Sequence, residues 1–228
     1  MLSANTMPNE WAQVCAVALA HLQEQLPWHR QVGPATTERA HAASASDEEC
    51  MASYRRGDSQ AFRILYQRYR DKLHRYVLRL ASRPGEAEEV FQDIWIAVIN
   101  SKDRYEPTSS FASWLFSIAH RRAADRWRAL SRHAPDGLSP STEDDSAQHL
   151  PATTHTPERH AQNDALGKAL LAAIDTLPLP QREAFLMKAE GELSLEDIAL
   201  ATGVSRETVK SRLRYAQQRL RAALAAWQ

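Results

Sequence analysis

Apolar side chains recur every three or four residues from Met51 to Arg132, which is the spacing of one face of an α-helix. Two interruptions rich in turn-forming residues, Ser82–Glu86 and the surroundings of Pro107, divide this stretch. None of it alternates between apolar and polar positions as a half-buried strand does. The pattern predicts three helices in an all-α domain: one capped by Asp58 or Ser59, one over about Glu86–Asn100 and one over about Phe111–Leu130.

The helical spacing returns in residues 162–228, which we predict to form a second small helical domain. Residues 133–161 between the two domains hold four prolines, many Ser and Thr residues and almost no large apolar side chain, as a flexible linker does. Residues 1–50 begin with one amphipathic helix, over Pro8–Leu26, and continue as small polar residues without an apolar period. The N-terminal extension is therefore expected to be disordered beyond its helix.

The second domain ends in a pattern of two short helices joined by a tight turn. Ser194 stands at an N-cap position, Gly203 occupies the turn, and Ser205 can cap the following helix. The helical period predicts which side chains of that last helix are buried: Val209, Leu213, Ala216, Leu220 and Leu224. It also predicts an outward face, made of Glu207, Ser211, Arg214 and Gln218 and flanked by Thr208, Lys210 and Tyr215.

This helix pair has the features of a DNA-binding helix-turn-helix, whose second helix enters the major groove by its N-terminal residues. Lys and Arg reach the acceptors of guanine there, and Glu can accept a hydrogen bond from cytosine. Arg206 and Arg212 lie nearer the buried stripe, so we expect them to contact phosphates. An ordinary surface helix is often basic as well, but here the glycine turn, both caps and the one-sided basic face agree on DNA binding.

The charge of the chain is unevenly distributed. The whole sequence has 28 basic and 28 acidic residues and a formal charge of zero. Residues 51–132 hold 16 basic and 9 acidic residues, whereas residues 1–50 and 133–161 are both net acidic. Arg206–Arg221 carries six basic residues and one acidic residue. The zero net charge of the chain is therefore the sum of two basic segments, residues 51–132 and 206–221, and two acidic ones, residues 1–50 and 133–161. The basic segments can still approach DNA.

Aromatic and basic residues are interleaved around the start of the third predicted helix. Proteins that bind single-stranded nucleic acid use this combination, because bases stack on aromatic rings while cations neutralise the backbone. Core packing is the alternative for the aromatic members. The aromatic members are Tyr105, Phe111, Trp114, Phe116 and Trp127, and the basic members are Arg121, Arg122, Arg126 and Arg128.

The second predicted helix, Glu86–Asn100, is apolar on one side and again partly apolar on the other. Such a helix is either fully buried or covered by a partner. Acidic and amide residues on its outer side favour a partner. The outer side carries Glu89, Gln92, Ile96, Ile99 and Asn100, with Asp93 and Trp95 at its margins.

Several classes of protein are excluded by the same sequence. No run approaches the ~18 apolar residues of a membrane span, and the N-terminus lacks the pattern of a signal peptide. Cys15 and Cys50 do not have metal-ligand spacing, and the nine histidines are scattered. We therefore expect a cytoplasmic protein without catalytic residues, metal, cofactor or membrane insertion. A stand-alone regulator would need an input domain, and an enzyme acting on nucleic acid would need an acidic or histidine cluster.

Four motifs, in order and spacing, resemble the sigma-70 family. They are "EAEEVFQDIWIAVI", "FASWLFSIAHRRAADRWR", "IDTLPLPQREAFLMKAEG" and the helix-turn-helix that follows. More narrowly, the chain is similar to extracytoplasmic-function (group IV) sigma factors, which keep only the second and fourth conserved regions. The likeness covers about residues 51–228 except the linker. It implies two helical domains, no catalytic site, and three partners: core RNA polymerase through its β′ clamp helices and β flap, promoter DNA, and an anti-sigma factor.

The resemblance also implies a role for each candidate residue. Glu89, Gln92, Asp93, Trp95 and Ile96 match the helix that binds the β′ clamp helices. The loop that includes Ser109, Ser110 and Phe111, with the helix carrying Trp114, Arg121, Arg122 and Arg126, matches the region that captures an unstacked −10 base and keeps the strands apart. Lys210, Ser211, Arg214 and Tyr215 match the positions that read the −35 element, and the other −35 candidates, Arg206, Glu207 and Thr208, lie in the same helix.

Two departures from the family pattern leave questions open. The family often has Asn where Arg122 stands, so the choice of base at −10 does not follow from the resemblance. The extension formed by residues 1–50 is also longer than usual. Its helix either docks an anti-sigma partner or shields the DNA-binding faces, unless translation begins at Met51.

Overall fold

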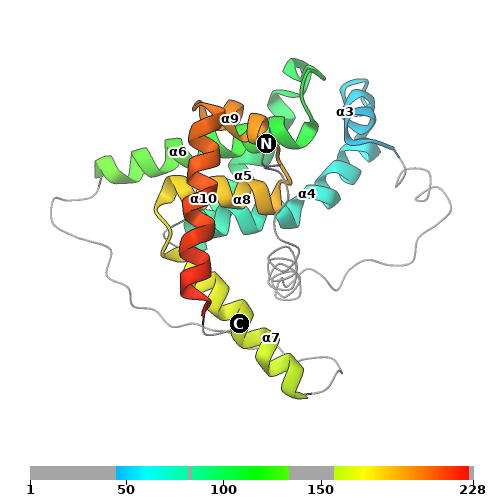
Figure 1. The fold of residues 1–228 in the computed structure, drawn as a ribbon. Helices are drawn as coiled ribbons and strands as arrows, with labels where there is room; N and C mark the ends of the chain where they lie inside the picture. The colour runs from blue at the N-terminus through cyan, green and yellow to red at the C-terminus, as the bar shows by residue number, and fades with distance from the viewer. Residues whose placement is uncertain (1–44, 82–83, 134–156, 226–228) are drawn as a thin grey trace, which may run out of the picture.

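The computed structural model describes residues 45–81, 84–133 and 157–225, and every regular element in these ranges is helical (Figure 1). The all-α prediction is confirmed. The helix expected over Pro8–Leu26 and most of the linker lie outside the described residues. The helices are α3 (Asp47–Arg55), α4 (Ser59–Leu80), α5 (Pro84–Asn100), the short 3₁₀ helix η1 (Lys102–Arg104), α6 (Phe111–His133), α7 (Pro157–Asp175), α8 (Leu179–Glu190), α9 (Leu195–Thr202) and α10 (Arg206–Ala223).

Helices α3 to α6 form the N-terminal half of the fold. As expected, Asp58 caps α4: its carboxylate accepts hydrogen bonds from the amides of Gln60 (2.9 Å) and Ala61 (3.4 Å). Helix α3 begins four residues before the boundary that we expected at Met51. Cys50 and Met51 are both buried against the core, so this half already starts inside the predicted extension.

Helices α7 to α10 form the C-terminal half, which begins at Pro157, five residues before the expected boundary. Ser194 caps α9 as predicted, because its hydroxyl accepts from the Asp197 amide (3.0 Å). Gly203 ends α9 with φ of +68°, in the left-handed region that suits glycine. The hydroxyl of Ser205 then accepts from the Thr208 amide (3.2 Å) and starts α10. The whole predicted stripe of α10 is buried.

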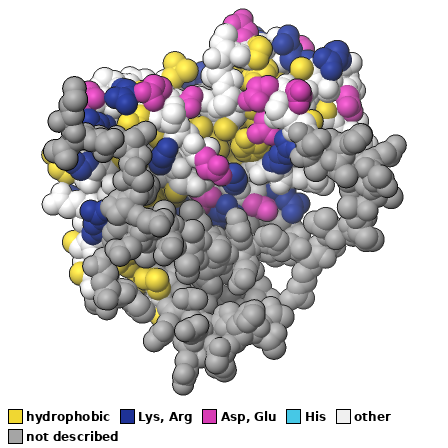
Figure 2. Space-filling view, turned by 45° about the vertical axis from the view of Figure 1, so that its right-hand side comes forward, with side chains coloured by type: hydrophobic (Ala, Val, Ile, Leu, Met, Phe, Trp, Pro, Cys, Tyr) yellow, Lys and Arg dark blue, Asp and Glu magenta, His cyan; other side chains and the backbone are white. Residues whose placement is uncertain are grey.

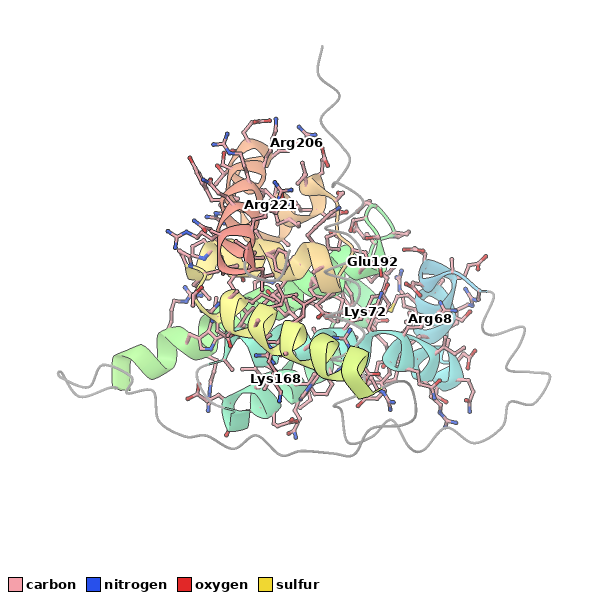
Figure 3. The ribbon with its side chains drawn as sticks, turned by 60° about the horizontal axis from the view of Figure 1, so that its bottom comes forward. Arg68, Lys72, Lys168, Glu192, Arg206 and Arg221 are labelled. Atoms are coloured by element: carbon pink, nitrogen blue, oxygen red, sulfur yellow. The ribbon has the colours of Figure 1, made fainter. Side chains whose placement is uncertain are left out.

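The two halves share one hydrophobic core. Helix α8 packs along α4, and α9 packs against α6. At this contact the guanidinium of Arg75 donates to both carboxylate oxygens of Glu190, at 2.7–3.1 Å, with both side chains at most 5% exposed. A second ion pair, Lys72 to Glu192 (2.7 Å), lies at the edge of the contact; both residues are labelled in Figure 3. The halves therefore form one body in the described structure.

Candidate DNA and polymerase interfaces

The outer face of α10 carries the residues expected to read −35 DNA. Because the stripe from Val209 to Leu224 is buried, the opposite side of the helix is left to solvent. Arg214 and Tyr215 interact with each other there: the Arg214 guanidinium lies 4.9 Å from the ring centroid and donates to the Tyr215 hydroxyl at 3.2 Å. All seven candidates are exposed: Arg206, Glu207, Thr208, Lys210, Ser211, Arg214 and Tyr215.

Acidic side chains balance the basic ones at the N-terminal end of α10. Arg206 donates to Glu196 of α9, and Glu207 lies between Arg206 (3.6 Å) and Lys210 (3.7 Å). The pKa of the Glu196 carboxyl is lowered by its own backbone amide in the first turn of α9 and then by Arg206. On the face drawn in Figure 2, Lys and Arg are interspersed with Asp and Glu rather than gathered into one basic patch. This arrangement gives only modest nonspecific attraction to DNA, since that attraction scales with the phosphates neutralised.

Helix α6 presents two exposed arginines, Arg121 and Arg122, in its middle turns. A third candidate, Arg126, donates to Glu89 of α5. The structure thus joins a residue expected to bind −10 DNA to one expected to bind polymerase.

The −10 candidates in the loop before α6 and in its first turn differ in how far their side chains are exposed to solvent. Ser110 is exposed and starts α6, its hydroxyl accepting from the Ser113 amide at 3.1 Å. Ser109 and Trp114 are half-buried. Phe111 is 0% exposed, packed against Tyr69 and Tyr105. The Phe111 ring belongs to the core of this structure, because Tyr69 of α4 and Tyr105 pack against it, and its contact with a DNA base stays a prediction.

Helix α5 shows the two-faced character expected of it. Ile96 and Ile99 are 54% and 44% exposed, whereas Ile94 on the inner side is fully buried. Trp95 is buried, as Phe111 is. It is 6% exposed, with its ring centroid 4.8 Å from that of Tyr66, so it supports α5 from inside. All residues predicted on the outer side are exposed: Glu89, Gln92, Ile96, Ile99 and Asn100, and Asp93 at the margin is exposed as well.

Sequence reasoning missed the part played by α3, although a signal for it exists. Ser46 and Glu49 form a capping box, in which the Ser46 hydroxyl accepts from the Glu49 amide (3.1 Å) and the Glu49 carboxylate accepts from the Ser46 amide (2.8 Å). A Ser followed three residues later by Glu is the sequence signature of that motif. It predicts a helix start within the segment that the apolar pattern assigns to the extension.

No helix in the described part of the chain is long and apolar enough to cross a membrane. Within the same ranges, no group of three or more His, Cys, Asp or Glu side chains is placed to hold a metal ion.

The exposed, basic last helix after a glycine turn and the two-faced α5 are the features from which the sequence predicts DNA binding and a protein partner. Comparisons with known proteins agree. The family model for sigma-70 region 2 matches residues 65–133, and the model for sigma-70 region 4 matches residues 167–220. Together the two matches span more than half of the chain. The chain belongs to the sigma-70 family of RNA polymerase sigma factors, within its extracytoplasmic-function group.

Two relatives of similar sequence are also RNA polymerase sigma factors. The chain is 32% identical to the ECF RNA polymerase sigma factor RpoE of Cereibacter sphaeroides, over 72% of this chain and 86% of the relative. It is 29% identical to the RNA polymerase sigma-H factor of Pseudomonas aeruginosa, over 78% of this chain and 93% of the relative. The protein is accordingly a transcription initiation factor that acts with core RNA polymerase at promoters.

Two solved structures are similar in fold. The sigma factor RpoE in complex with the anti-sigma factor NepR, from Bartonella quintana, matches with a TM-score of 0.57 and 25% identity, covering 72% of this chain and 96% of that one. CnrH in complex with the cytosolic domain of CnrY matches with a TM-score of 0.54 and 20% identity, covering 80% and 99%.

Proposed function

We propose that this sigma factor divides its work among three surfaces. Helix α10 reads the −35 element, α6 and the loop before it hold the opened −10 element, and the outer face of α5 binds the β′ clamp helices, while the C-terminal half meets the β flap. The observation that carries the proposal is the burial pattern of α10. Its apolar stripe is completely buried and every residue expected to meet the −35 bases is exposed on the opposite side.

The proposal for α5 has separate support. A helix end with two isoleucines about half exposed, beside Gln92 and Asp93, is suited to a protein partner, because an exposed apolar patch rimmed by polar residues is typical of such interfaces. In the described part of the chain, no other helix packs over that face. The β′ clamp helices are the partner that the family provides.

We further propose that an anti-sigma factor restrains the protein. The support is that RpoE and CnrH, which share its fold, were both solved with a protein bound, and the protein bound to RpoE is the anti-sigma factor NepR. The sigma factor itself carries out no catalytic step and needs no cofactor, since polymerisation belongs to the core enzyme. Its place of action is the cytoplasm, where polymerase and promoters are.

The test is run-off transcription with core enzyme and two variants that affect different surfaces. Arg214→Ala should lower the discrimination between a matched and a mutated −35 element by about 1–3 kcal/mol, the worth of one good base contact, and leave core binding intact. Gln92→Ala combined with Asp93→Ala should weaken binding to core polymerase, measured by fluorescence anisotropy, without altering −35 discrimination.

Each variant has a control. Arg219 lies on the same helix as Arg214 and has the same charge, and Asp125 has the same charge as Asp93 but lies on another helix. Arg219→Ala removes an exposed arginine near the C-terminal end of α10, and Asp125→Ala removes an exposed acid of α6. Both should behave like the wild type. Equal losses for Arg214→Ala and Arg219→Ala would mean that α10 contributes charge but no base reading, and unchanged core affinity in the α5 variant would remove the polymerase assignment.

A further inference from the structure

Helix α3 contacts both ends of the loop that precedes α6. Its residue Glu48 reaches the start of α6, and its residue Arg55 reaches the segment around Tyr105. The tip between these ends, residues 106–110, is mostly exposed. A short helix remote in sequence is thus joined to the loop that we assign to the −10 element.

The first contact is made at the amide end of α6. The Glu48 carboxylate accepts a hydrogen bond from the Phe111 amide at 3.0 Å, while the Ser110 hydroxyl accepts from the Ser113 amide. The first amides of a helix have no partner within it and favour a negative charge. Because Glu48 supplies that charge, the place where a helix N-terminus would hold a DNA phosphate is already taken.

The second contact is made at the other end of the loop. The guanidinium of Arg55 donates to the carbonyl of Tyr105 at 3.0 Å and to that of Asp103 at 3.4 Å. The Tyr105 side chain is buried, and its hydroxyl donates to the Ser109 carbonyl (3.4 Å). Lys102 adds a contact with the ring of Tyr54 on α3, with its ammonium 5.0 Å from the centroid.

Helix α3 itself is firmly attached, so it can impose a position on the loop. The capping box at Ser46 defines its first turn. The carboxylate of Asp47 accepts from Arg68 (2.6 Å) and from the Tyr69 hydroxyl, both on α4. Burial of Cys50 and Met51 adds apolar contact with the core. These contacts make α3 and α4 one rigid support.

We propose that Glu48 and Arg55, the α3 anchors, are positioning residues for −10 recognition. They hold the exposed tip 106–110 in the conformation that accepts an unstacked nucleobase, and the Glu48 charge keeps a phosphate from binding at the α6 end in its place. The inference rests on the function proposed above for this loop. Glu48 and Arg55 precede residues 65–133, which match the sigma-70 region 2 model, and in this proposal they act through the loop rather than by contact with DNA.

The experiment uses the full chain with core polymerase on promoters whose −10 strands are already mismatched, so that strand separation is not limiting. Each promoter carries a different base at one −10 position, and the readout is the ratio of transcripts from the best and the worst base. Glu48→Ala and Arg55→Ala should each lower this ratio about tenfold, the effect of losing one charge-assisted hydrogen bond. Glu48→Gln keeps an acceptor oxygen and should retain most of the ratio.

The matched control is Glu49→Ala, which removes the neighbouring acid of α3 and its bond to the Ser46 amide but touches no loop residue. It should leave the ratio unchanged. If Glu49→Ala lowers the ratio as far as Glu48→Ala, a general weakening of α3 explains the loss and the anchoring role is wrong. Hydrogen exchange of residues 105–111 provides a second measurement, and it should quicken in Glu48→Ala and Arg55→Ala only.

A loop variant separates this inference from the function on which it rests. Thr108→Ala combined with Ser109→Ala changes the exposed tip directly. If this variant loses base selectivity while both anchor variants keep it, the loop reads −10 but α3 does not position it. If all of them keep the wild-type ratio, the assignment of the loop to −10 is itself wrong.

Discussion

Tyr76 shows how a single polar residue joins the two halves. Its side chain is completely buried in α4, and its hydroxyl donates to Glu183 of α8 at 3.3 Å. Glu183 also bonds to His120 of α6, so one carboxylate connects three helices. Burial, followed by the charge of Glu183, raises the pKa of Tyr76 well above its usual value of 10.

The raised pKa predicts a loss of stability in alkali. Above about pH 10 the unfolded chain releases the Tyr76 proton while the folded protein keeps it, so the free energy of unfolding falls by about 1.4 kcal/mol per pH unit until the folded pKa is reached. Tyr76→Phe should remove this contribution and flatten the dependence. Urea denaturation at pH 9 to 11 measures it, and Tyr215→Phe, at an exposed site, is the control. An unchanged slope in Tyr76→Phe would contradict the argument.

At the scale of single elements, local sequence signals are sufficient for much of the fold. Ser194, Gly203 and Ser205 predict the helix-turn-helix because caps and turns depend on neighbouring residues only. Periodicity is also enough to separate the buried and exposed sides of α10. It cannot tell whether a third element covers a given face, which is why the sequence leaves burial and partner contact open for Trp95 and Phe111, and the structure buries both.

The turn of the helix-turn-helix gives a prediction at this scale. Gly203→Ala should lower the free energy of unfolding by about 1 kcal/mol, because an alanine in the left-handed region is strained even though no atom lies within 4 Å of the new methyl group. Gly203→Asn should cost less, since Asn tolerates that conformation. Thermal denaturation measures both.

Gly85→Ala supplies the comparison for this pair. Gly85 also faces open space but lies in α5 without a positive φ, so alanine there should leave stability unchanged or raise it. Equal effects at Gly203 and Gly85 would mean that the left-handed turn is not the source of the cost.

At the scale of the whole molecule, the contact between the halves could not be predicted from the sequence. Arg75 and Glu190 are separated by 115 positions, and neither belongs to a local motif that indicates its partner. Gly191 beside them permits a close approach, because a methyl group there would lie 2.8 Å from the Met187 carbonyl and 3.0 Å from the Phe116 ring on α6. The contact therefore depends both on the Arg75–Glu190 ion pair and on the close backbone approach at Gly191, and no local sequence pattern indicates either.

The buried ion pair can be tested by breaking it and by replacing it. Arg75→Met alone, or Glu190→Leu alone, should destabilise the protein by about 3–5 kcal/mol because each leaves a buried charge without its partner, whereas the double variant should come close to the wild type. Asp125→Ala breaks an exposed pair with Arg128 and should cost less than about 1 kcal/mol. Urea denaturation measures all four.

The pH dependence of Arg75→Met gives the pair a second signature. Burial raises the pKa of Glu190, and Arg75 opposes that rise. Without Arg75 the folded protein holds the Glu190 proton to a higher pH than the unfolded chain does, so stability falls as the pH rises above the ordinary carboxyl range. Arg75→Met should therefore be less destabilised at pH 5 than at pH 8, a difference absent from the double variant. An equal loss of unfolding free energy in Arg75→Met at pH 5 and pH 8 would contradict the argument, because it would show that the charge of Glu190 is not the source of the destabilisation.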